Sequence, residues 1–359
     1  MERNVNLSII AAGGAAINIL RKYRSEYGAV NTEIGANTIK HVAIDTSVSN
    51  IDKAGFVVLD PNDESEFEAG HIDVTPYVIA ESGAGKNRAS LLKDIQWKLD
   101  KSGVYNEFGD INIFIFSMSG GSGSVIAPLL IREAGKRGKR IIAIGIVDAC
   151  SETDCFNSIN TIRTLEAFAK DEKLYIPSMI FNNVEVGRVK VNLSVIDRLH
   201  QLEGLFVCPG IEEVDYTDKM NFLSPVGIVS SVKPGLYNMS IGALDDKGEV
   251  YGLPGEDTVD LSNGTPVHST FTVSDDGLAP DIVTGVLYLG IVEDYNLTNR
   301  YFNLPFSVNV GLPISVDIIN MLNDKQARYE RAANFKAKSD ATEQLQAKEG
   351  EVSSTGVIA

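Results

Sequence analysis

The chain has 359 residues, of which 44% are hydrophobic, so it can bury a large core and is long enough for about two domains of ~150 residues each. Its 32 Lys and Arg residues stand against 48 Asp and Glu residues, and the net charge of -16 argues against general binding to DNA, RNA or anionic lipid. The three cysteines, Cys150, Cys155 and Cys208, are too few and too irregularly spaced for a disulfide framework or a zinc site, which favours a reducing cytoplasm.

The hydrophobic segments predict neither export nor membrane insertion. The apolar run from Leu7 to Leu20 follows Glu2 and a single basic residue, Arg3, and lacks the n-region and cleavage pattern of a signal peptide. No run reaches the ~20 apolar residues that a membrane-spanning helix needs. We therefore expect a cytoplasmic protein with no membrane partner and no direct nucleic-acid partner.

The first half of the chain alternates β-rich runs with helix-like segments, a pattern typical of a mainly parallel sheet covered on both faces. Strands are expected at Val5–Ala11, His41–Ile44, Phe56–Leu59, Ile111–Ser117, Arg140–Val147 and Tyr175–Asn182. Helices are expected at Ala15–Tyr23, Asn87–Lys101, Val125–Lys136, Cys155–Lys170 and Val191–Leu205. In the second of these helices, Trp97 is expected in the core with the stripe of Leu91, Leu92, Ile95 and Leu99.

The second half changes character near Ser224-Pro225. The β-branched runs Pro266–Val273, Ile282–Val292 and Phe306–Val310 are separated by Gly, Asp and Asn turns and predict a smaller sheet domain. A helix is expected from about Ile314 to Lys338, followed by a polar tail. The predicted division is 1–190 for a ligand-binding domain, 191–224 for a central helix and the loop after it, 225–313 for the sheet domain and 314–359 for the C-terminal helix and tail.

The most informative segment runs from Phe114 to Leu130, where a buried-strand pattern stops at a Gly/Ser loop and restarts as an apolar helix. The loop consists of Ser119, Gly120, Gly121, Ser122, Gly123 and Ser124. Its glycines lack Cβ atoms, so successive backbone N–H groups can turn toward an anion, while Ser122 and Ser124 add hydroxyl donors and can cap the helix. The positive end of the helix would face the ligand's charge. Gly-rich loops also serve as plain turns, so the content of the other loops is needed to distinguish an anion site from a simple connection.

Two familiar phosphate-binding signatures are not met. A Walker A loop ending at Gly85-Lys86 would need Gly at position 80 and Ser or Thr at position 87, which are Ala80 and Asn87. A Rossmann fingerprint starting at Gly121 would need Gly or Ala at position 126, which is Ile126. A P-loop NTPase and an NAD enzyme are therefore disfavoured.

The order and content of the loops that follow the strands resemble the tubulin/FtsZ family of filament-forming GTPases. The Gly/Ser loop is similar to that family's GGGTGSG signature, with Ser119 in place of the first Gly and Val125 in place of the last. The Gly-Ser-Gly-Ser-Val ending, the compact length and the C-terminal tail are most similar to the PhuZ-like phage tubulins. The resemblance implies an α/β fold: a tubulin/FtsZ-like GTPase domain with a mainly parallel sheet, a long central helix, and a smaller α+β C-terminal domain with a C-terminal helix and tail.

The resemblance also implies a GTP or GDP site built from several loops besides the Gly/Ser loop. The implied contacts are Gly13, Gly14 and Asn18 in the first loop, Asp45 and Thr46 in the second, Gly83, Ala84 and Gly85 near the γ-phosphate, Asn182 or Asn183 and Asn192 at the base, and Arg188 where many relatives stack an aromatic ring on the base.

The segment Glu213-Val214-Asp215-Tyr216-Thr217-Asp218 resembles the family's Asn-x-Asp-x-x-Asp loop, with Glu213 where Asn is usual. In the family this loop enters the nucleotide pocket of the next subunit, which implies catalytic roles for Asp215 and Asp218. Phosphoryl transfer to water needs Mg²⁺, backbone donors and a carboxylate that orients the water. No side chain of this chain is assigned to the metal.

The function that the resemblance implies is a filament-forming GTPase, activated by polymerisation, whose partner is the next copy of itself in a head-to-tail homopolymer. Its cellular task would be to position phage DNA or the replication compartment in the host bacterial cytoplasm, with lateral contacts through the C-terminal tail. Two alternatives stay open: a nucleotide-dependent oxidoreductase that uses the same Gly loops, and a non-hydrolysing structural homologue.

Overall fold

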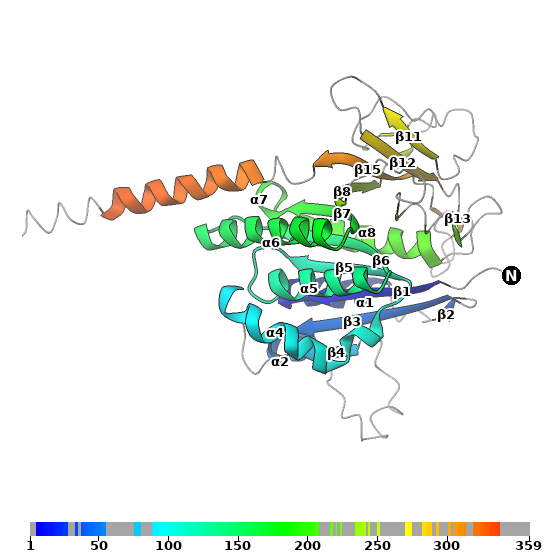
Figure 1. Cartoon of the computed structure of the whole chain (residues 1–359), viewed down its shortest axis with the longest axis horizontal. Coiled ribbons are helices and arrows are strands. Elements are labelled where there is room, and N and C mark those ends of the chain that lie inside the picture. Colours follow the sequence, from blue (N-terminus) through cyan, green and yellow to red (C-terminus); the bar gives the residue numbers. More distant parts are fainter. Residues whose placement is uncertain are drawn as a thin grey trace, which may run out of the picture.

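A computed structural model of the chain describes residues 5–27, 33–34, 37–54, 75–79, 88–207, 216–217, 220, 223–224, 234–241, 243–244, 250–251, 270–274, 282–288, 292–293, 301–302, 305–313 and 319–337. Within these residues the centre of the molecule is an 11-stranded sheet (Figure 1).

Seven of the described strands run parallel to one another, in the spatial order β4-β3-β1-β5-β6-β7-β8. Their bounds are β1 Asn6–Ala12, β3 Asn37–Asp45, β4 Thr75–Val78, β5 Ile111–Ser117, β6 Arg140–Val147, β7 Tyr175–Asn182 and β8 Gly235–Ile241. This arrangement confirms the predicted mainly parallel sheet, including the exact bounds expected for β5, β6 and β7. The run Phe56–Leu59 lies outside the described residues.

Antiparallel strands extend the sheet at both edges. β2 (Glu33–Ile34) pairs with β3, and at the other edge β15 (Pro305–Pro313), β12 (Ile282–Tyr288) and β11 (Thr270–Ser274) continue from β8. Two short pairs stand apart, β9 (Ala243–Leu244) with β10 (Val250–Tyr251) and β13 (Val292–Glu293) with β14 (Tyr301–Phe302). Because β8 pairs with β7, the second-half strands share the sheet of the first half, and the domain division stays a prediction.

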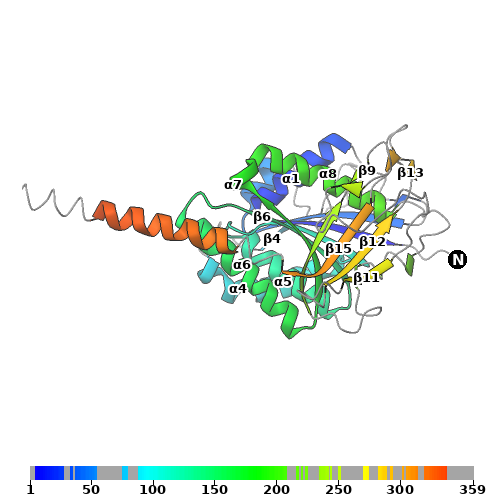
Figure 2. The same ribbon diagram turned by 90° about the horizontal axis from the view of Figure 1, so that it is seen from above.

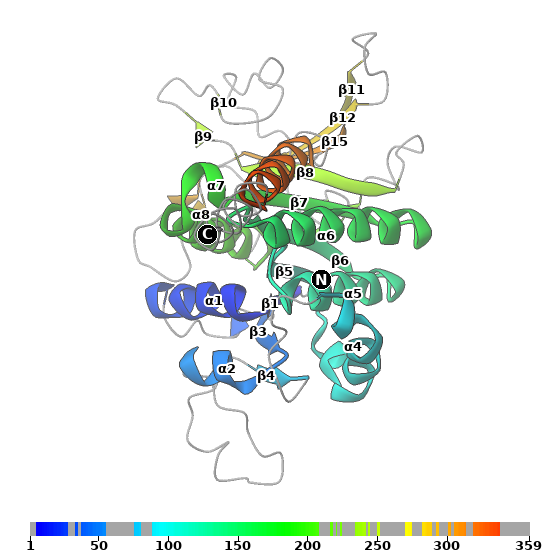
Figure 3. The ribbon, with the colours of Figure 1, turned by 90° about the vertical axis from the view of Figure 1, so that its left-hand side faces the viewer.

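Helices cover both faces of the sheet (Figures 2 and 3). One face carries α1 (Gly14–Tyr27), α2 (Val48–Ala54) and the long α8 (Arg188–Val207). The short α7 (Asn183–Val186) precedes α8, and its Val184 packs against the core cluster of the other face. The other face carries α4 (Arg88–Ser102), the 3₁₀ turn η1 (Val104–Glu107), α5 (Gly123–Lys136) and α6 (Glu152–Asp171).

The central strands are apolar on both faces because each face packs against helices. Along β5, Ile111, Ile113 and Ile115 join the core cluster beneath α1 and α8, while Phe114 and Phe116 join the cluster beneath α4, α5 and α6. A strand with two buried faces is a continuous hydrophobic run, which is the pattern that predicted these strands.

Trp97 is not in the core, so that prediction is wrong. Ile95 and Leu99 on α4 are buried, whereas the Trp97 side chain is 62% exposed. Successive residues of a helix are ~100° apart, so Trp97, two positions from each buried residue, points to roughly the opposite face.

The predicted C-terminal helix is confirmed over residues 319–337. Leu322 is fully buried in the core cluster beneath α4, α5 and α6, and the Tyr329 hydroxyl donates to the Ala149 carbonyl oxygen at 2.9 Å. Residues 331–337 are exposed, and in Figures 1 and 2 the orange helix extends away from the body of the molecule. None of the described helices has the length and apolar character required to cross a membrane.

Candidate functional site

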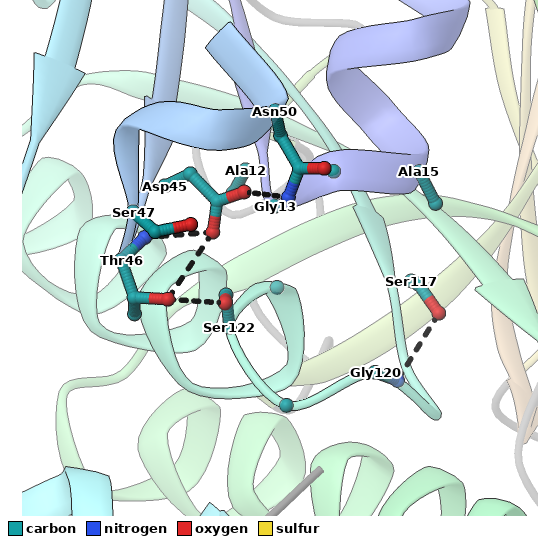
Figure 4. A pocket seen from close by; sticks show the side chains of 13 residues that line it. Ala12, Gly13, Ala15, Asp45, Thr46, Ser47, Asn50, Ser117, Gly120 and Ser122 are labelled. Carbon is teal, nitrogen blue, oxygen red and sulfur yellow. Dashed lines mark hydrogen bonds between the residues drawn. The ribbon is translucent and has the colours of Figure 1, made fainter. Parts of the chain in front are cut away.

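The loops after β1, β3 and β5 meet around a cavity of about 230 Å³ (Figure 4). The strand order reverses at β1, with β3 on one side and β5 on the other, and the crevice beyond the carboxyl ends of strands at such a reversal is the usual ligand site of open α/β sheets. The cavity is lined by Ala12, Gly13, Gly14, Ala15, Asp45, Thr46, Ser47, Asn50, Ser117, Gly120, Gly121, Ser122 and Gly123.

The first loop and the Gly/Ser loop pack backbone against backbone. Gly13 has φ 84°, in the left-handed region, and its N–H donates to the Ile44 carbonyl oxygen at 2.8 Å. A Cβ on Gly13 would lie 2.8 Å from the Gly123 nitrogen, and a Cβ on Gly123 would lie 2.7 Å from the Ala12 oxygen. Glycine is required at both positions because any side chain would push the two loops apart.

The Gly/Ser loop lines the cavity with backbone N–H groups that are not used among the described residues. Within the described part of the chain, the N–H groups of Gly121, Ser122 and Gly123 donate to no protein acceptor, and they lie at the N-terminus of α5. Unsatisfied donors and the positive end of a helix together favour an anion. Among the described residues no Lys or Arg lines the cavity, so within this part of the chain the backbone groups would carry most of the attraction for a phosphate chain.

The expected capping role of Ser122 and Ser124 is wrong. Ser122 occupies the N-cap position of α5 in a helical conformation, and its side chain makes no cap hydrogen bond. Its hydroxyl instead lies 2.8 Å from the Thr46 hydroxyl, as the dashed line in Figure 4 shows. Ser124 is fully buried, and its hydroxyl donates back to the Gly121 oxygen at 3.2 Å. Both serines therefore shape the loop and leave the helix N–H groups available.

Asp45 is the one ionisable side chain among the described lining residues, and it is only 1% exposed. Its Oδ1 accepts from the Thr46 N–H at 2.7 Å, and its Oδ2 accepts from the Asn50 amide. These bonds orient Thr46 toward Ser122, so Asp45 organises the second loop.

Asn50 was not predicted, and neither were Ala12, Ala15, Ser47 and Ser117. A position on the first turns of α2 that faces back toward the preceding strand end is the signal that could have identified Asn50. Ser117 stabilises the Gly/Ser loop, since its hydroxyl accepts from the Gly120 N–H at 3.2 Å.

The back of the Gly/Ser loop is anchored on α6. Asn157 donates its amide to the Ser119 oxygen at 3.0 Å, and the Thr161 hydroxyl donates to the Met118 oxygen at 2.9 Å. Ser119, a predicted ligand contact, is buried behind the loop and does not line the cavity.

Four asparagines predicted as nucleotide contacts, Asn18, Asn182, Asn183 and Asn192, lie outside this cavity. Asn182 accepts from the Val184 N–H at 3.0 Å and so caps α7. The Oδ1 atom of Asn183 is buried, with no partner among the described residues. Asn192 is partly buried on α8, and Asn18 is exposed on α1. The structure therefore brings together the first loop, the second loop and the Gly/Ser loop, and roles for these four asparagines stay predictions.

Arg188, predicted where relatives stack a ring on the base, is 71% exposed and pairs with Asp148 at the end of β6. Its Nη2 and Nε donate to Asp148 Oδ2 at 2.8 and 3.2 Å. Burial by itself would raise the pKa of Asp148, but hydrogen bonds from Cys150 and Arg188 outweigh it and hold that pKa below its usual value. The guanidinium therefore has a fixed carboxylate partner beside the predicted base position.

Gly83, Ala84, Gly85, Glu213, Asp215 and Asp218 lie outside the described residues. The nearest described neighbours of the two aspartates are Tyr216, Thr217 and Met220. The Met220 oxygen accepts from the Nε of Arg140, the first residue of β6, at 3.2 Å. This contact is at the amino end of β6, whereas the cavity is at the carboxyl ends of the strands. An eight-residue strand separates the two edges by roughly 25 Å.

Known proteins with similar sequences come from Pseudomonas phages. No profile of a known protein family matches the chain. The phage tubulin-like protein of PhiPA3 is 26% identical over 218 residues, which cover 58% of this chain and 68% of that protein. Those of phiKZ and 201phi2-1 are each 28% identical, over 34% and 40% of this chain, and the matches span only 38% and 48% of their own lengths.

Solved structures of phage tubulins superpose on most of the chain. The phage tubulin PhuZ with GDP matches with a TM-score of 0.63 at 17% identity, over 91% of this chain and 92% of that one. A protofilament of TubZ from bacteriophage PhiKZ matches with a TM-score of 0.62 at 19% identity over the same shares. The chain therefore has the tubulin/FtsZ-like fold and is a sequence relative of the phage tubulin-like proteins.

Proposed function

We propose that the chain is a GTPase that assembles head to tail into filaments and hydrolyses GTP at the contacts between its subunits. The observation that carries the proposal is the cavity at the strand-order reversal, where N–H groups of the Gly/Ser loop at the start of α5 bond no acceptor among the described residues. The similarity to phage tubulin-like proteins, one solved as a protofilament and one with GDP, supports both the assembly and the guanine nucleotide.

The cavity has the chemistry that a triphosphate needs. The Gly/Ser loop would hold phosphate oxygens through the backbone N–H groups of Gly121, Ser122 and Gly123, and these fixed donors would not have to reorganise as charge develops. Thr46, Ser47 and Ser122 offer hydroxyl oxygens, the kind of ligand that Mg²⁺ takes. Bound with the nucleotide, Mg²⁺ would neutralise charge on the β- and γ-phosphates.

The described residues around the predicted catalytic loop support catalysis in trans. Met220 lies at the amino edge of the sheet and the cavity at the carboxyl edge, so a described sequence neighbour of Asp215 and Asp218 is far from its own subunit's cavity. Stacking a second copy end to end would bring one subunit's amino edge to the next one's carboxyl edge. Such a head-to-tail contact does not close on itself and therefore grows into a fibre.

The test is GTP hydrolysis measured against protein concentration, with light scattering recorded in the same cuvette. We expect the rate per subunit to rise steeply above a critical concentration, together with scattering. A low rate that never depends on concentration would contradict the coupling of assembly to catalysis and would favour a non-hydrolysing homologue. Bound NAD or FAD absorbance would favour the oxidoreductase alternative instead.

For the cellular task, we propose positioning of phage DNA or of the replication compartment in the host bacterial cytoplasm. The net charge of -16 supports an indirect mode of action, since filaments of such subunits would repel DNA. Fluorescently tagged wild-type chain should form filaments in infected cells, and a variant that cannot assemble should leave the phage DNA off centre. A central DNA position with the assembly-defective variant would refute this task.

A further inference from the structure

Arg140 is fixed at the amino edge of the sheet, on the side opposite the cavity. Its N–H donates to the Asp110 oxygen at 3.0 Å, and its carbonyl oxygen accepts from the Asn112 amide at 3.3 Å. The side chain of Arg140 therefore starts from a rigid point of β6.

The guanidinium of Arg140 bonds to a backbone oxygen that is distant in the sequence. Its Nε donates to the oxygen of Met220, 80 positions further along the chain. Among the described residues no carboxylate lies within ion-pair distance of it, in contrast to Arg132, Arg137 and Arg188, which pair with acidic side chains. The side chain is partly buried, and burial lowers its pKa, while the nearby Tyr216 phenol acts in the opposite sense. A partly buried guanidinium whose described bond goes to a main-chain oxygen serves to hold that main chain.

The held segment is anchored at further points. Met220 is 7% exposed and Leu223 is 1% exposed, both within the core cluster beneath α1 and α8. Tyr216 packs against the same cluster. In sequence, Tyr216 lies between Asp215 and Asp218, and Met220 lies two residues after Asp218, so the anchors lie between and after the two predicted catalytic residues.

We propose that Arg140 is a positioning residue for hydrolysis. It sets the segment that carries Asp215 and Asp218 so that this segment fits the cavity of the next subunit, and it takes no part in binding its own subunit's nucleotide. This inference rests on the proposed function. It predicts that loss of the guanidinium damages a neighbour's active site and leaves the chain's own cavity intact.

The first test compares Arg140→Met with Lys139→Met, which removes a positive charge at the adjacent position without touching Met220. A third variant, Arg140→Gln, has an amide that can still donate a hydrogen bond. We assay GTP affinity below the assembly concentration and turnover above it for the wild type and all three variants. We expect Arg140→Met to keep wild-type affinity and to lose about 10- to 100-fold in turnover, since a misplacement of ~1 Å can cost 10²-fold. Arg140→Gln should fall between, and Lys139→Met should match wild type. Wild-type turnover by Arg140→Met would overturn the inference.

The second test mixes chains with opposite defects. Gly120→Asp places a carboxylate in the cavity, where a Cβ meets only ordinary contacts at 3.5 Å, so this chain should still fold. Its own cavity should not bind a polyanion, while its segment with Asp215 and Asp218 is unchanged. Mixed with Arg140→Met, it should give at least about fivefold more turnover than the two chains assayed separately, because repulsion by the new carboxylate blocks only its own cavity. If the mixture gains nothing, or if Arg140→Met and Arg140→Gln lose GTP affinity in step with turnover, Arg140 is merely structural. If the wild type itself shows no concentration-dependent turnover, it is the proposed function that fails.

Discussion

At the residue scale, the cavity depends on the two glycines at the contact between the first loop and the Gly/Ser loop. The Cβ of an alanine at Gly123 would lie 2.7 Å from the Ala12 oxygen, and backbone cannot move away as a flexible side chain can. At Gly120 the nearest atoms would be 3.5 Å away, an ordinary contact. Gly120 and Gly123 lie three positions apart in one loop, but an added Cβ would clash with backbone only at Gly123.

Gly123→Ala should lower the free energy of unfolding by about 1–3 kcal/mol, as overpacking does. It should also weaken GTP binding, because the loops that form the phosphate side would separate. Urea unfolding and nucleotide titration measure the two effects. Gly120→Ala is the matched control for stability, with a change within about 0.5 kcal/mol. Equal destabilisation by both substitutions would contradict the close approach of the loops.

The Asp148–Arg188 pair predicts a pH-dependent contribution to stability. The pKa of Asp148 is lower in the folded chain than its usual value, so the stabilisation is present above the ordinary Asp pKa of about 3.9 and is lost as the pH falls through the folded pKa. Asp148→Asn should therefore lower the melting temperature at pH 7, and the difference from wild type should shrink as the pH falls below the ordinary Asp pKa of about 3.9. Asp171→Asn, which changes an exposed carboxyl at the end of α6, should show little difference at either pH. A constant deficit for Asp148→Asn would exclude an electrostatic origin.

At the element scale, the helix of residues 319–337 has a docked start and an exposed end. Leu322 is fully buried and Tyr329 bonds to the loop after β6, whereas Phe335 is 77% exposed. The same loop carries Asp148, the partner of Arg188 at the start of α8. The docked turns of this helix therefore contact the loop that also holds the predicted base side of the site.

Leu322→Ala should release the helix from the body of the molecule. Removing a fully buried leucine side chain costs about 2–5 kcal/mol, and the loss falls on a helix with few other buried residues. Hydrogen exchange should accelerate in residues 319–337 and stay slow in β5 and β6. Slow exchange throughout would mean that Tyr329 and the partly buried side chains suffice to hold the helix.

Phe335→Ala should leave the free energy of unfolding of the subunit within about 0.5 kcal/mol of wild type, because the side chain is exposed. If the projecting end of the helix contacts another copy in the filament, the critical concentration for assembly should rise. Sedimentation of polymer measures it, and GTP affinity of the unassembled chain should be unchanged. An unchanged critical concentration would make this end of the helix a passive connection to the tail.

At the scale of the whole molecule, the proposed GTPase is complete only when two copies meet. The cavity and the described residues beside the predicted catalytic loop lie at opposite edges of the sheet, with the length of β6 between them. Asp215→Ala and Asp218→Ala should therefore keep GTP binding and assembly while turnover falls by about 10²-fold or more, as for loss of other water-orienting groups. Retained turnover in both variants would remove these residues from the mechanism. The matched control is Asp171→Asn, whose turnover should equal wild type.

The sequence by itself determined the local elements and pointed to three of the loops that line the cavity. Buried parallel strands are continuous apolar runs and amphipathic helices repeat at 3.6 residues, so β5, β6 and β7 could be bounded exactly. Gly13, Gly14 and the Gly/Ser loop were identifiable because loops at the carboxyl ends of strands meet at one edge. Trp97 could also have been placed correctly, since its angular position on α4 is a property of sequence alone.

Only the tertiary structure decided which side chains meet. The Thr46–Ser122 contact joins loops 76 positions apart, Arg188 meets Asp148 across 40 positions, and Arg140 reaches Met220 across 80. It also decided that β8, β15, β12 and β11 extend the first sheet through the β7–β8 pair. Such contacts depend on strand order and on how the helices are positioned against the sheet. Both arise from the packing of the whole chain, so no periodic sequence pattern marks the residues that make these contacts.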